Sequence, residues 1–372
     1  MNILWLQWRD IKHPWSGGAE VYMHQICKRL AQKGHKIHAI TSWHPKLKHK
    51  ETIDGYTIQR IGNHDNYILH IPKILKTYKN WANIIIEDTS KIPLLTPILR
   101  PNKTPPVVAI VHHLNRDIYL QELPIHKAII AYMLETIMPK LYTTLPNTHL
   151  IAVSNSTKQE LIKLGAKPQK IHIVPNAIDH NPHNPNTIEH KAPQPTILWF
   201  SRYKKYKQPH HAITAFLLAS KQIPNAKLII AGKGTETLRE IAKKLKLKNI
   251  EILGEVNEKT KAELMQQAWA LIYTSKKEGY GLTVLEANAH GTPAIGYNVP
   301  GLRDSIRHME TGILVPYGNI KAIAKAMIML TEDQELWRRL AENALNWAKQ
   351  FDWDKSAEKF EKILSRALLR EP

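Results

Sequence analysis

Short apolar segments alternate with longer segments of helical periodicity along almost the whole chain, and this alternation restricts the fold more than any other feature. In the first half the apolar segments are NILWLQW (2–8), HKIHAIT (35–41), NIIIED (83–88), VVAIV (107–111), HLIAVS (149–154) and KIHIVP (170–175). In the second half they are TILWF (196–200), AKLIIAG (226–232), NIEILG (249–254), ALIYT (270–274), PAIGY (293–297) and GILVP (312–316). Strands that alternate with helices form parallel sheets covered on both faces, and such sheets bind ligands beyond the carboxyl ends of their strands. The pattern therefore predicts an α/β protein with two similar halves.

The length of 372 residues exceeds the usual size of one domain and favours two. The segment HNPHNPNTIEHKAPQP begins at residue 180, is rich in proline, asparagine and histidine, and contains few apolar residues. This composition predicts a solvated linker at 181–195, rather than a metal site made from its histidines. The domains on either side are then 1–180 and 196–352.

The chain is strongly basic, with 52 lysines and arginines against 32 acidic residues and a formal charge of +20. Nucleic acid, an anionic membrane surface and phosphorylated substrates all fit this charge. No run approaches the roughly 18 apolar residues that span a bilayer. The apolar start has no basic leader and reads as a strand, and the single cysteine, Cys27, allows no internal disulfide. These features predict a cytoplasmic protein.

The segment EGYGLTVLE (278–286) places two carboxylates eight positions apart, around a glycine-rich turn that opens a helix. The first amides of a helix lack internal partners and carry partial positive charge, so they suit a diphosphate. One carboxylate would then hold ribose hydroxyls and the other a sugar. A solvated helix terminus is the alternative. The binding residues predicted in this segment are Glu278, Gly279, Gly281, Leu282, Thr283 and Glu286.

The first crossover carries a second glycine pair at the start of a helix. Gly17 and Gly18 open a segment of helical periodicity that runs to Lys33 and is closed by Gly34. The pair suits phosphate contact and equally suits close packing of the helix on a strand. It is not a dinucleotide-binding GxGxxG fingerprint, which argues against a nicotinamide-dependent oxidoreductase.

Many motifs in register make the chain resemble the retaining glycosyltransferases of family 4, which have the GT-B fold. The matching segments are GGAE (17), VHH (111), AVSNSTKQEL (152), VPNAID (174), SRYKKYK (201), AGKG (231), EGYGLTVLE (278), GTPAIGYNVPGLRD (291), TGILVP (311) and FDWDKSAEKFEKIL (351). The resemblance implies two Rossmann-like domains that face each other across a cleft, with the last helix, 353–372, crossing back to the N-terminal domain. Ser201, Ala177 and His290 depart from the family pattern.

The resemblance also assigns roles to individual residues. It implies that Glu286 binds the ribose, that Glu278 contacts the donor sugar, and that Arg202 and Lys207 stabilise the departing diphosphate. It places His112 near the transferred sugar, with His113 as the alternative. The implied catalytic residues are His112, Glu278, Arg202 and Lys207, and the implied donor-binding residues also include Gly17, Gly18 and Gly232.

The implied reaction moves a hexose-type sugar from a UDP- or GDP-sugar to a glycan, lipid-linked or small acceptor, with retention at the anomeric carbon. Front-face substitution is favoured, because double displacement needs a carboxylate nucleophile and Glu278 is only a formal candidate. No metal cofactor is expected, and the DWD at 352–354 is interpreted as a helix cap. An epimerase or hydrolase of the same fold is the alternative. A nucleic-acid-binding protein is a weaker alternative, because it would explain the basic charge of the chain but not the paired glutamates.

The acceptor side is predicted from IEDTSKIPLLTP (86–97) and from the segment 122–142. In the second segment Ile129, Ile130, Met133, Leu134, Ile137 and Met138 recur at helical spacing. Such a helix is expected to pack in a core or between domains, and the alternative is a helix that faces an anionic membrane, as in a peripheral protein on its inner face. The acceptor-binding candidates are Glu87, Asp88, Lys91 and His113.

Overall fold

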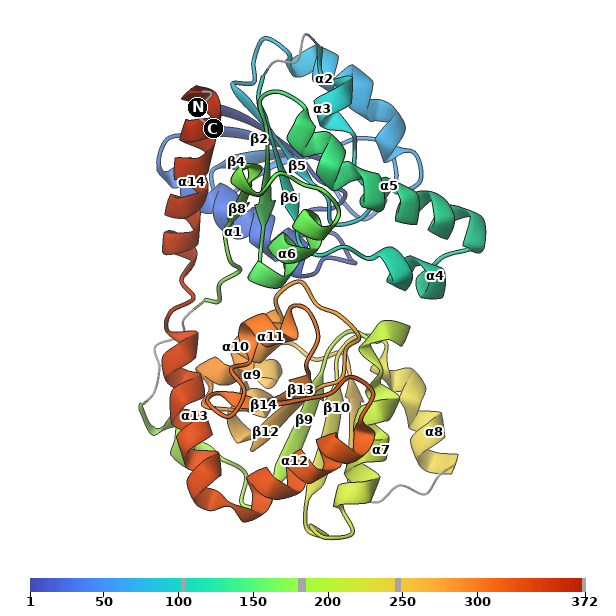
Figure 1. Cartoon of the computed structure of the whole chain (residues 1–372), viewed down its shortest axis with the longest axis vertical. Helices are drawn as coiled ribbons and strands as arrows, with labels where there is room; N and C mark the ends of the chain where they lie inside the picture. The colour runs from blue at the N-terminus through green and yellow to red at the C-terminus, as the bar shows by residue number, and fades with distance from the viewer. Residues whose placement is uncertain (102–104, 180–184, 245–248, 370–372) are drawn as a thin grey trace. The chain divides into compact units, whose positions relative to one another are not determined.

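A computed structural model describes residues 1–101, 105–179, 185–244 and 249–369 of the chain (Figure 1). The chain forms two compact units, each with its own parallel sheet. Unit 1 comprises Met1–Asn176 and Trp353–Pro372, and unit 2 comprises Ala177–Asp352. The division thus falls between residues 176 and 177 rather than after residue 180, and the C-terminal helix is grouped with the N-terminal half.

Unit 1 is built on an eight-stranded sheet with the order β3-β4-β2-β1-β5-β6-β7-β8. The strands are β1 (Asn2–Leu6), β2 (Lys36–Thr41), β3 (Lys50–Ile53), β4 (Tyr56–Arg60), β5 (Ile84–Asp88), β6 (Val107–Val111), β7 (Thr148–Ala152) and β8 (Ile171–Ile173). Both neighbours of β1 run parallel to it, with Trp5 opposite Ala39 and Ile86. The six apolar segments predicted for this half therefore all form strands.

The hairpin β3–β4 was not predicted. Its strands run antiparallel and are joined by Asp54 and Gly55, both of which have positive φ, 43° and 86°. Two consecutive residues of positive φ are what a two-residue hairpin turn requires, and Asp-Gly is a preferred sequence for it. The signal was present, but β3 alternates half-buried and exposed residues and lacks an apolar run.

Helices cover the sheet of unit 1, and the C-terminal helix is one of them. They are α1 (Gly18–Gln32), α2 (Ile71–Tyr78), α3 (Thr96–Leu99), α4 (Tyr119–Glu122), α5 (Ile125–Thr144), α6 (Asn155–Lys163) and α14 (Trp353–Leu369). Trp5 of β1 stacks on Phe360 of α14 at 5.5 Å, and Trp353 meets the ring of Tyr22 at 5.8 Å. Burial of these large rings, each contributing about 1.5–3 kcal/mol, attaches α14 to this unit.

Helix α5 departs from the expectation that its apolar residues are packed. Met138 is buried, but Ile129, Ile130, Met133 and Ile137 are each about half exposed. The buried side of the helix is formed instead by small and polar residues, among them Ala128, Ala131, Glu135, Tyr142 and Thr143. No helix in the described part of the chain is long and apolar enough to cross a membrane.

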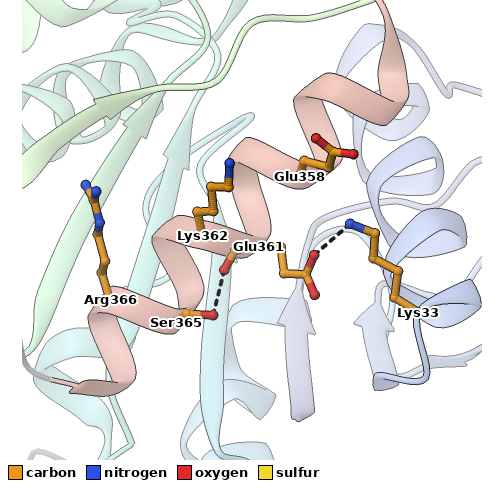
Figure 2. A pocket seen from close by; sticks show the side chains of 6 residues that line it. All are labelled: Lys33, Glu358, Glu361, Lys362, Ser365 and Arg366. Carbon is orange, nitrogen blue, oxygen red and sulfur yellow. Dashed lines mark hydrogen bonds and ion pairs between the residues drawn. The ribbon is translucent and has the colours of Figure 1, made fainter.

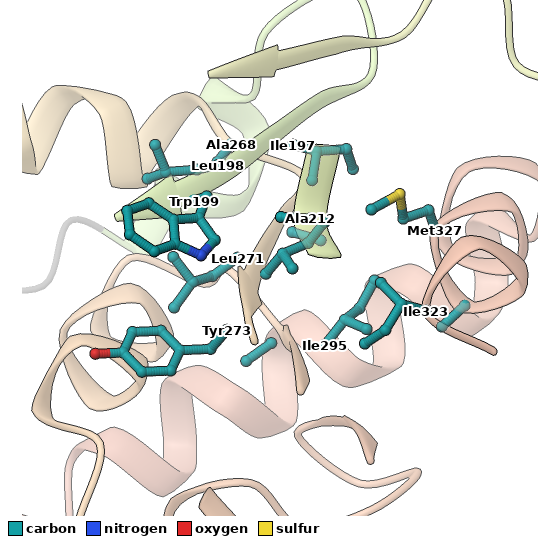
Figure 3. Packing of buried hydrophobic residues seen from close by; sticks show 14 of the residues in the cluster. Ile197, Leu198, Trp199, Ala212, Ala268, Leu271, Tyr273, Ile295, Ile323 and Met327 are labelled. Atoms are coloured by element: carbon teal, nitrogen blue, oxygen red, sulfur yellow. The ribbon is translucent and has the colours of Figure 1, made fainter. Parts of the chain in front are cut away.

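Unit 2 contains a six-stranded parallel sheet with the order β11-β10-β9-β12-β13-β14. Its strands are β9 (Thr196–Phe200), β10 (Lys227–Ala231), β11 (Ile250–Gly254), β12 (Ala270–Tyr273), β13 (Ala294–Tyr297) and β14 (Gly312–Val315). Its helices are α7 (Pro209–Ala219), α8 (Arg239–Lys244), α9 (Glu258–Gln267), α10 (Leu282–Ala289), α11 (Leu302–Ser305), α12 (Ile320–Glu332) and α13 (Gln334–Ala348). Side chains such as Trp199, Leu271 and Met327 form the core between sheet and helices (Figure 3).

The predicted solvated linker 181–195 is in part a packed segment of unit 2. Residues 180–184 lie outside the described ranges, but Pro185–His190 form a short 3-10 helix whose Ile188 packs against the core. Lys191 donates to the Thr292 hydroxyl at 2.6 Å, and Trp269 donates to the carbonyl of Ala192 at 2.9 Å. Partly buried hydrogen bonds, which composition alone does not indicate, attach this segment to unit 2.

Candidate functional site

The strand order of unit 2 reverses between β9 and β12, because β9 lies between β10 and β12. In open α/β sheets such a switch point leaves a crevice at the carboxyl ends of the two strands, where ligands bind. The loop after β9 carries Arg202 and Lys207, and the loop after β12 carries Glu278. The topology therefore brings the predicted donor-site charges to the part of the sheet where a ligand is expected.

Hydrogen bonds and a close backbone contact fix the loop after β9. The Thr274 hydroxyl donates to the Lys207 and Gln208 carbonyls, each at 2.9 Å, and accepts from the Trp199 indole at 3.1 Å. A β-carbon at Gly232 would lie 2.1 Å from the Ser201 carbonyl oxygen, so only glycine fits there. This loop is therefore held rigidly between β10 and β12.

Lys207 is buried and forms an ion pair with Glu278. Its ammonium also donates to the Tyr273 hydroxyl at 3.2 Å and lies 5.1 Å from the centres of both the Tyr206 and Tyr273 rings. Burial alone would lower the pKa of the Lys207 ammonium, but the Glu278 carboxylate and the two tyrosines raise it well above its usual value. Lys207 is thus a fixed positive charge at the switch point.

The backbone of Glu278 is positioned by the loop after β13. Its amide donates to the Pro300 carbonyl at 3.1 Å. A β-carbon on Gly301, whose φ is +83°, would lie only 2.3 Å from the Glu278 carbonyl oxygen. The motif GTPAIGYNVPGLRD therefore has a physical role: its Pro-Gly pair lets the Glu278 loop approach closely.

Helix α10 begins directly after Gly281, as predicted. Gly281 has φ +84°, and a β-carbon there would lie 2.8 Å from the Ser305 hydroxyl oxygen. Leu282 and Thr283 form the first turn and are half-buried, and Gly279 is half-buried in the preceding loop. The first turn thus presents its amides next to the Glu278 loop, as diphosphate binding at a helix N-terminus requires.

Glu286 lies in α10 and forms an ion pair with a lysine that the sequence analysis missed. Lys261 Nζ of α9 lies 2.7 Å from Glu286 Oε1 and 3.3 Å from Glu258 Oε2. Burial would lower the pKa of the Lys261 ammonium, but the Glu286 carboxylate raises it above its usual value. Burial raises the pKa of the Glu286 carboxyl, and Lys261 offsets part of that effect. Nothing in the sequence around Lys261 indicated this pairing.

In unit 1 His112 and Asp88 form a buried pair at the carboxyl ends of β6 and β5. His112 Nε2 lies 2.8 Å from Asp88 Oδ2, and Asp88 Oδ1 accepts from the Ser90 amide at 2.9 Å. The edge of the Tyr22 ring contacts the imidazole, 5.4 Å between centres. The Asp88 carboxylate therefore fixes the orientation of His112, and acceptor contact by Asp88 remains a prediction. His113 is half-buried and bonds Asn115 Oδ1 at 3.0 Å.

Glu87, predicted to contact the acceptor, is held inside unit 1. Its side chain is fully buried and accepts hydrogen bonds from the Leu94 and Thr96 amides and from the Tyr142 hydroxyl, at 2.8–2.9 Å. Burial raises the pKa of the Glu87 carboxyl to about 7, although these hydrogen bonds lower it in part. With both oxygens engaged internally, Glu87 fixes the loop that follows β5.

The remaining predicted residues have less specific surroundings. Lys91 is half-buried over the Trp8 ring, 5.2 Å from its centre, and its ammonium contacts His64. Arg202 is half-buried in the loop after β9, beside exposed Lys204 and Lys205.

The glycine pair at the start of α1 has a structural partner. The Gly17 amide donates to Glu20 Oε2 at 2.7 Å, and Glu20 Oε1 accepts from Arg9 Nε at 2.8 Å. The motif GGAE is thus explained locally by a carboxylate that caps its own helix. Gly18 is exposed in the first turn, and phosphate contact by this pair remains a prediction.

The DWD segment and a surface pocket both lie at α14, and both contain an ion pair with the C-terminal end of α1. In the DWD segment Asp352 precedes the first residue of α14, while Asp354 accepts from Arg29 Nε at 2.5 Å. A surface pocket between the end of α1 and α14 is lined by Lys33, Glu358, Glu361, Lys362, Ser365 and Arg366 (Figure 2). Its Glu361 pairs with Lys33 at 2.8 Å and with His35 at 2.7 Å. No predicted site residue lines this pocket.

Comparison with known proteins agrees with this geometry. Residues 16–182 match the model of Glycosyltransferase Family 4, and residues 181–347 match that of Glycosyl transferases group 1. The chain is 26% identical over 388 residues to N-acetyl-alpha-D-glucosaminyl L-malate synthase of Bacillus anthracis, with 94% of each chain covered.

Solved structures show the same fold. Sucrose-phosphate synthase of Thermosynechococcus elongatus superimposes with a TM-score of 0.80 at 19% identity, covering 98% of each chain. Anabaena HepE in complex with UDP-glucose gives a TM-score of 0.77 at 21% identity, covering 98% of this chain and 99% of that one. With both halves matched by family models and the whole chain by the fold, this protein is a glycosyltransferase of the family 4, group 1 type, with a GT-B fold.

Proposed function

We propose that this glycosyltransferase moves a hexose-type sugar from a UDP-sugar to a glycan or lipid-linked acceptor, with retention and without a metal ion. The observation that carries the proposal is the fixed Lys207–Glu278 pair at the switch point, beside the first turn of α10. Such a site places one cation, the Lys207 ammonium, beside one hydrogen-bond acceptor, the Glu278 carboxylate. The binding of UDP-glucose by HepE supports a uridine donor, and GDP-sugars are the alternative.

The charge of the leaving group determines the role of Lys207 in this proposal. A nucleoside diphosphate gains negative charge as the glycosidic bond breaks, and a buried ammonium together with helix amides stabilises that charge. These groups need no reorganisation, because Lys207 is already held by two tyrosines and Glu278. Arg202, five residues earlier in the same loop, would add a second cation.

Glu278 and Glu286 would hold the neutral parts of the donor. A carboxylate that accepts from a hydroxyl contributes about 1.5–3 kcal/mol. In the proposed complex Glu286 takes the ribose and Glu278 the sugar hydroxyls, while His112, whose Nε2 faces Asp88, accepts through Nδ1 from a hydroxyl of the transferred sugar. Front-face substitution then lets the departing phosphate oxygen take the proton of the acceptor hydroxyl.

Binding of a donor panel tests the proposal directly. UDP-, GDP- and ADP-sugars are added to the protein, with and without EDTA, and the thermal midpoint is recorded. We expect one nucleotide class to raise the midpoint, with the rise unchanged by EDTA and lost in Glu286→Ala. Glu258→Ala is the matched control, because Glu258 also pairs with Lys261 yet its side chain is 90% exposed.

Four outcomes would contradict parts of the proposal. The absence of a shift with every nucleotide would remove the donor site, and a shift that needs a metal would remove the metal-free mechanism. NMR of the product then determines the anomeric configuration, and an inverted product would exclude front-face substitution with retention. A product epimerised or hydrolysed in the presence of every acceptor would favour an epimerase or hydrolase.

A further inference from the structure

Helix α5 carries large apolar side chains on the side that unit 1 does not cover. Its buried side packs in unit 1, while Ile129, Ile130, Met133 and Ile137 on the opposite side are 49%, 59%, 55% and 53% exposed. Exposed apolar side chains gathered on one face therefore indicate a surface that contacts something apolar.

The exposed apolar surface continues at the N-terminal end of α5. Leu120 in α4, Leu123 in the connection and Ile125 at the start of α5 are 49%, 39% and 64% exposed. Figure 1 shows α4 and the start of α5 projecting from the rest of unit 1. We call the seven residues Leu120, Leu123, Ile125, Ile129, Ile130, Met133 and Ile137 the α5 ridge.

The exposed charged residues of α5 itself are basic, while the neighbouring α4 carries the half-buried Glu122. His126 and Lys140 are exposed at positions that the helical repeat places on the same side as Met133, whereas the helix's acidic residue, Glu135, is buried. The Glu135 carboxylate is held by the Arg116 amide at 2.8 Å and by the Tyr119 hydroxyl at 2.8 Å. The solvent side of α5 itself therefore carries apolar and basic groups without an acidic one.

More lysines adjoin the C-terminal end of the helix. A β-carbon at Gly165 would touch the Lys140 side chain at 3.4 Å, and the Lys167 amide donates to the Thr143 hydroxyl at 3.1 Å. Lys163 and Lys167, which flank Gly165, are both exposed. Each basic residue near an anionic leaflet contributes about 1 kcal/mol of attraction.

We propose that the α5 ridge docks this protein on the surface of an anionic lipid bilayer, with α5 lying in the interface. Apolar side chains would enter the boundary between headgroups and acyl chains, while Lys140, Lys163 and Lys167 contact lipid phosphates. A second copy of the chain fits less well. Two such faces would bring like charges together, and each chain already carries +20.

Vesicle sedimentation tests the proposal without using the sugar donor. The full chain is mixed with phosphatidylcholine vesicles, or with vesicles that also contain phosphatidylglycerol, and the bound fraction is measured at low and high salt. We expect binding to the anionic vesicles that weakens as salt rises. The variant Ile130→Gln/Met133→Gln/Ile137→Gln should lower the partition coefficient by about tenfold or more, and Lys140→Glu by about fivefold.

Matched variants separate docking from folding. Leu69→Gln removes an apolar side chain that is 76% exposed elsewhere in unit 1 and should leave vesicle binding unchanged. The triple variant should keep the thermal midpoint of the wild type, because the three side chains face solvent. The proposal would be overturned if the wild-type protein did not bind anionic vesicles, or if the triple variant bound them as well as the wild type. A wild-type dimer that the triple variant abolishes would assign the α5 ridge to a second copy.

Discussion

Replacing Gly301 by alanine tests whether the loop after β13 positions Glu278. The new β-carbon would lie 2.3 Å from the Glu278 carbonyl oxygen and 2.5 Å from its carbonyl carbon, distances that no packed structure tolerates. Because both contacts are with backbone, no flexible side chain can move away to relieve them. Alanine at φ +83° is strained as well. Either the chain loses stability, or the Glu278 loop moves.

Gly318 supplies a control that separates these two effects. Its φ is +78°, but a β-carbon there would meet nothing within 4 Å. Gly318→Ala therefore measures the conformational cost alone, about 1–2 kcal/mol. For a domain of this size 1 kcal/mol lowers the thermal midpoint by roughly 2–4 °C. We expect a larger loss for Gly301→Ala, or an equal loss together with donor binding weakened by about tenfold or more.

The assay combines thermal unfolding with calorimetric titration of the donor identified in the panel. Wild type, Gly318→Ala and Gly301→Ala are compared in both measurements. If the Gly301 variant matched the Gly318 variant in midpoint and in donor affinity, the contact between Gly301 and Glu278 would have no role in the site, and the positioning described above would be refuted.

Three further changes have expected outcomes that follow from the hydrogen bonds and ion pairs of the site. Lys261→Met should weaken donor binding severalfold while lowering stability by less than about 1 kcal/mol, because the Lys261–Glu286 pair is partly exposed; calorimetry against Glu286→Ala checks this. Asp88→Asn should lower kcat by roughly ten- to a hundredfold with little change in KM for the donor, because His112 loses its orienting carboxylate; an unchanged kcat would contradict the positioning role. Glu87 has a folded pKa of about 7 against 4.5 in the unfolded chain, so the folded state binds more protons between these values and the free energy of unfolding should decrease as pH rises through that window, by about 3 kcal/mol in total. Glu87→Gln should flatten this dependence in urea unfolding from pH 4.5 to 8, and an unchanged profile would exclude Glu87 as its source.

The local sequence pattern was sufficient to predict most of the strands and two of the helix ends. The twelve apolar segments all became strands, and Gly34 and Gly281 end or begin helices as predicted, with φ +85° and +84°. Both signals act within a few residues, since burial of a strand and a positive φ are properties of the residue and its neighbours. The β3–β4 hairpin was missed because its Asp-Gly turn joins strands without an apolar run.

Contacts between distant segments could not be predicted in the same way. Lys261 and Glu286 are 25 residues apart, and Asp88 and His112 are 24 residues apart. The order of the strands in the sheet brings each pair together. The hydrophobic periodicity of a single segment does not determine that order. The same limit explains why the apolar residues of α5 were expected to be packed, since helical spacing does not reveal which side is covered.

The Lys207–Glu278 pair argues for function because stability alone does not favour it. Moving two charges out of water costs several kcal/mol each, and an apolar pair of similar volume often serves a core as well or better. The Lys207 ammonium nevertheless lies 5.1 Å from the centres of two tyrosine rings at the switch point. The Thr274 hydroxyl holds the loop of Lys207, and the close contact of Gly301 holds the loop of Glu278. A nucleotide sugar carries an anionic diphosphate directly bonded to a neutral, hydroxyl-rich ring. A cation and a hydrogen-bond acceptor fixed side by side match that polarity, with the ammonium placed for the diphosphate and the carboxylate for the hydroxyls.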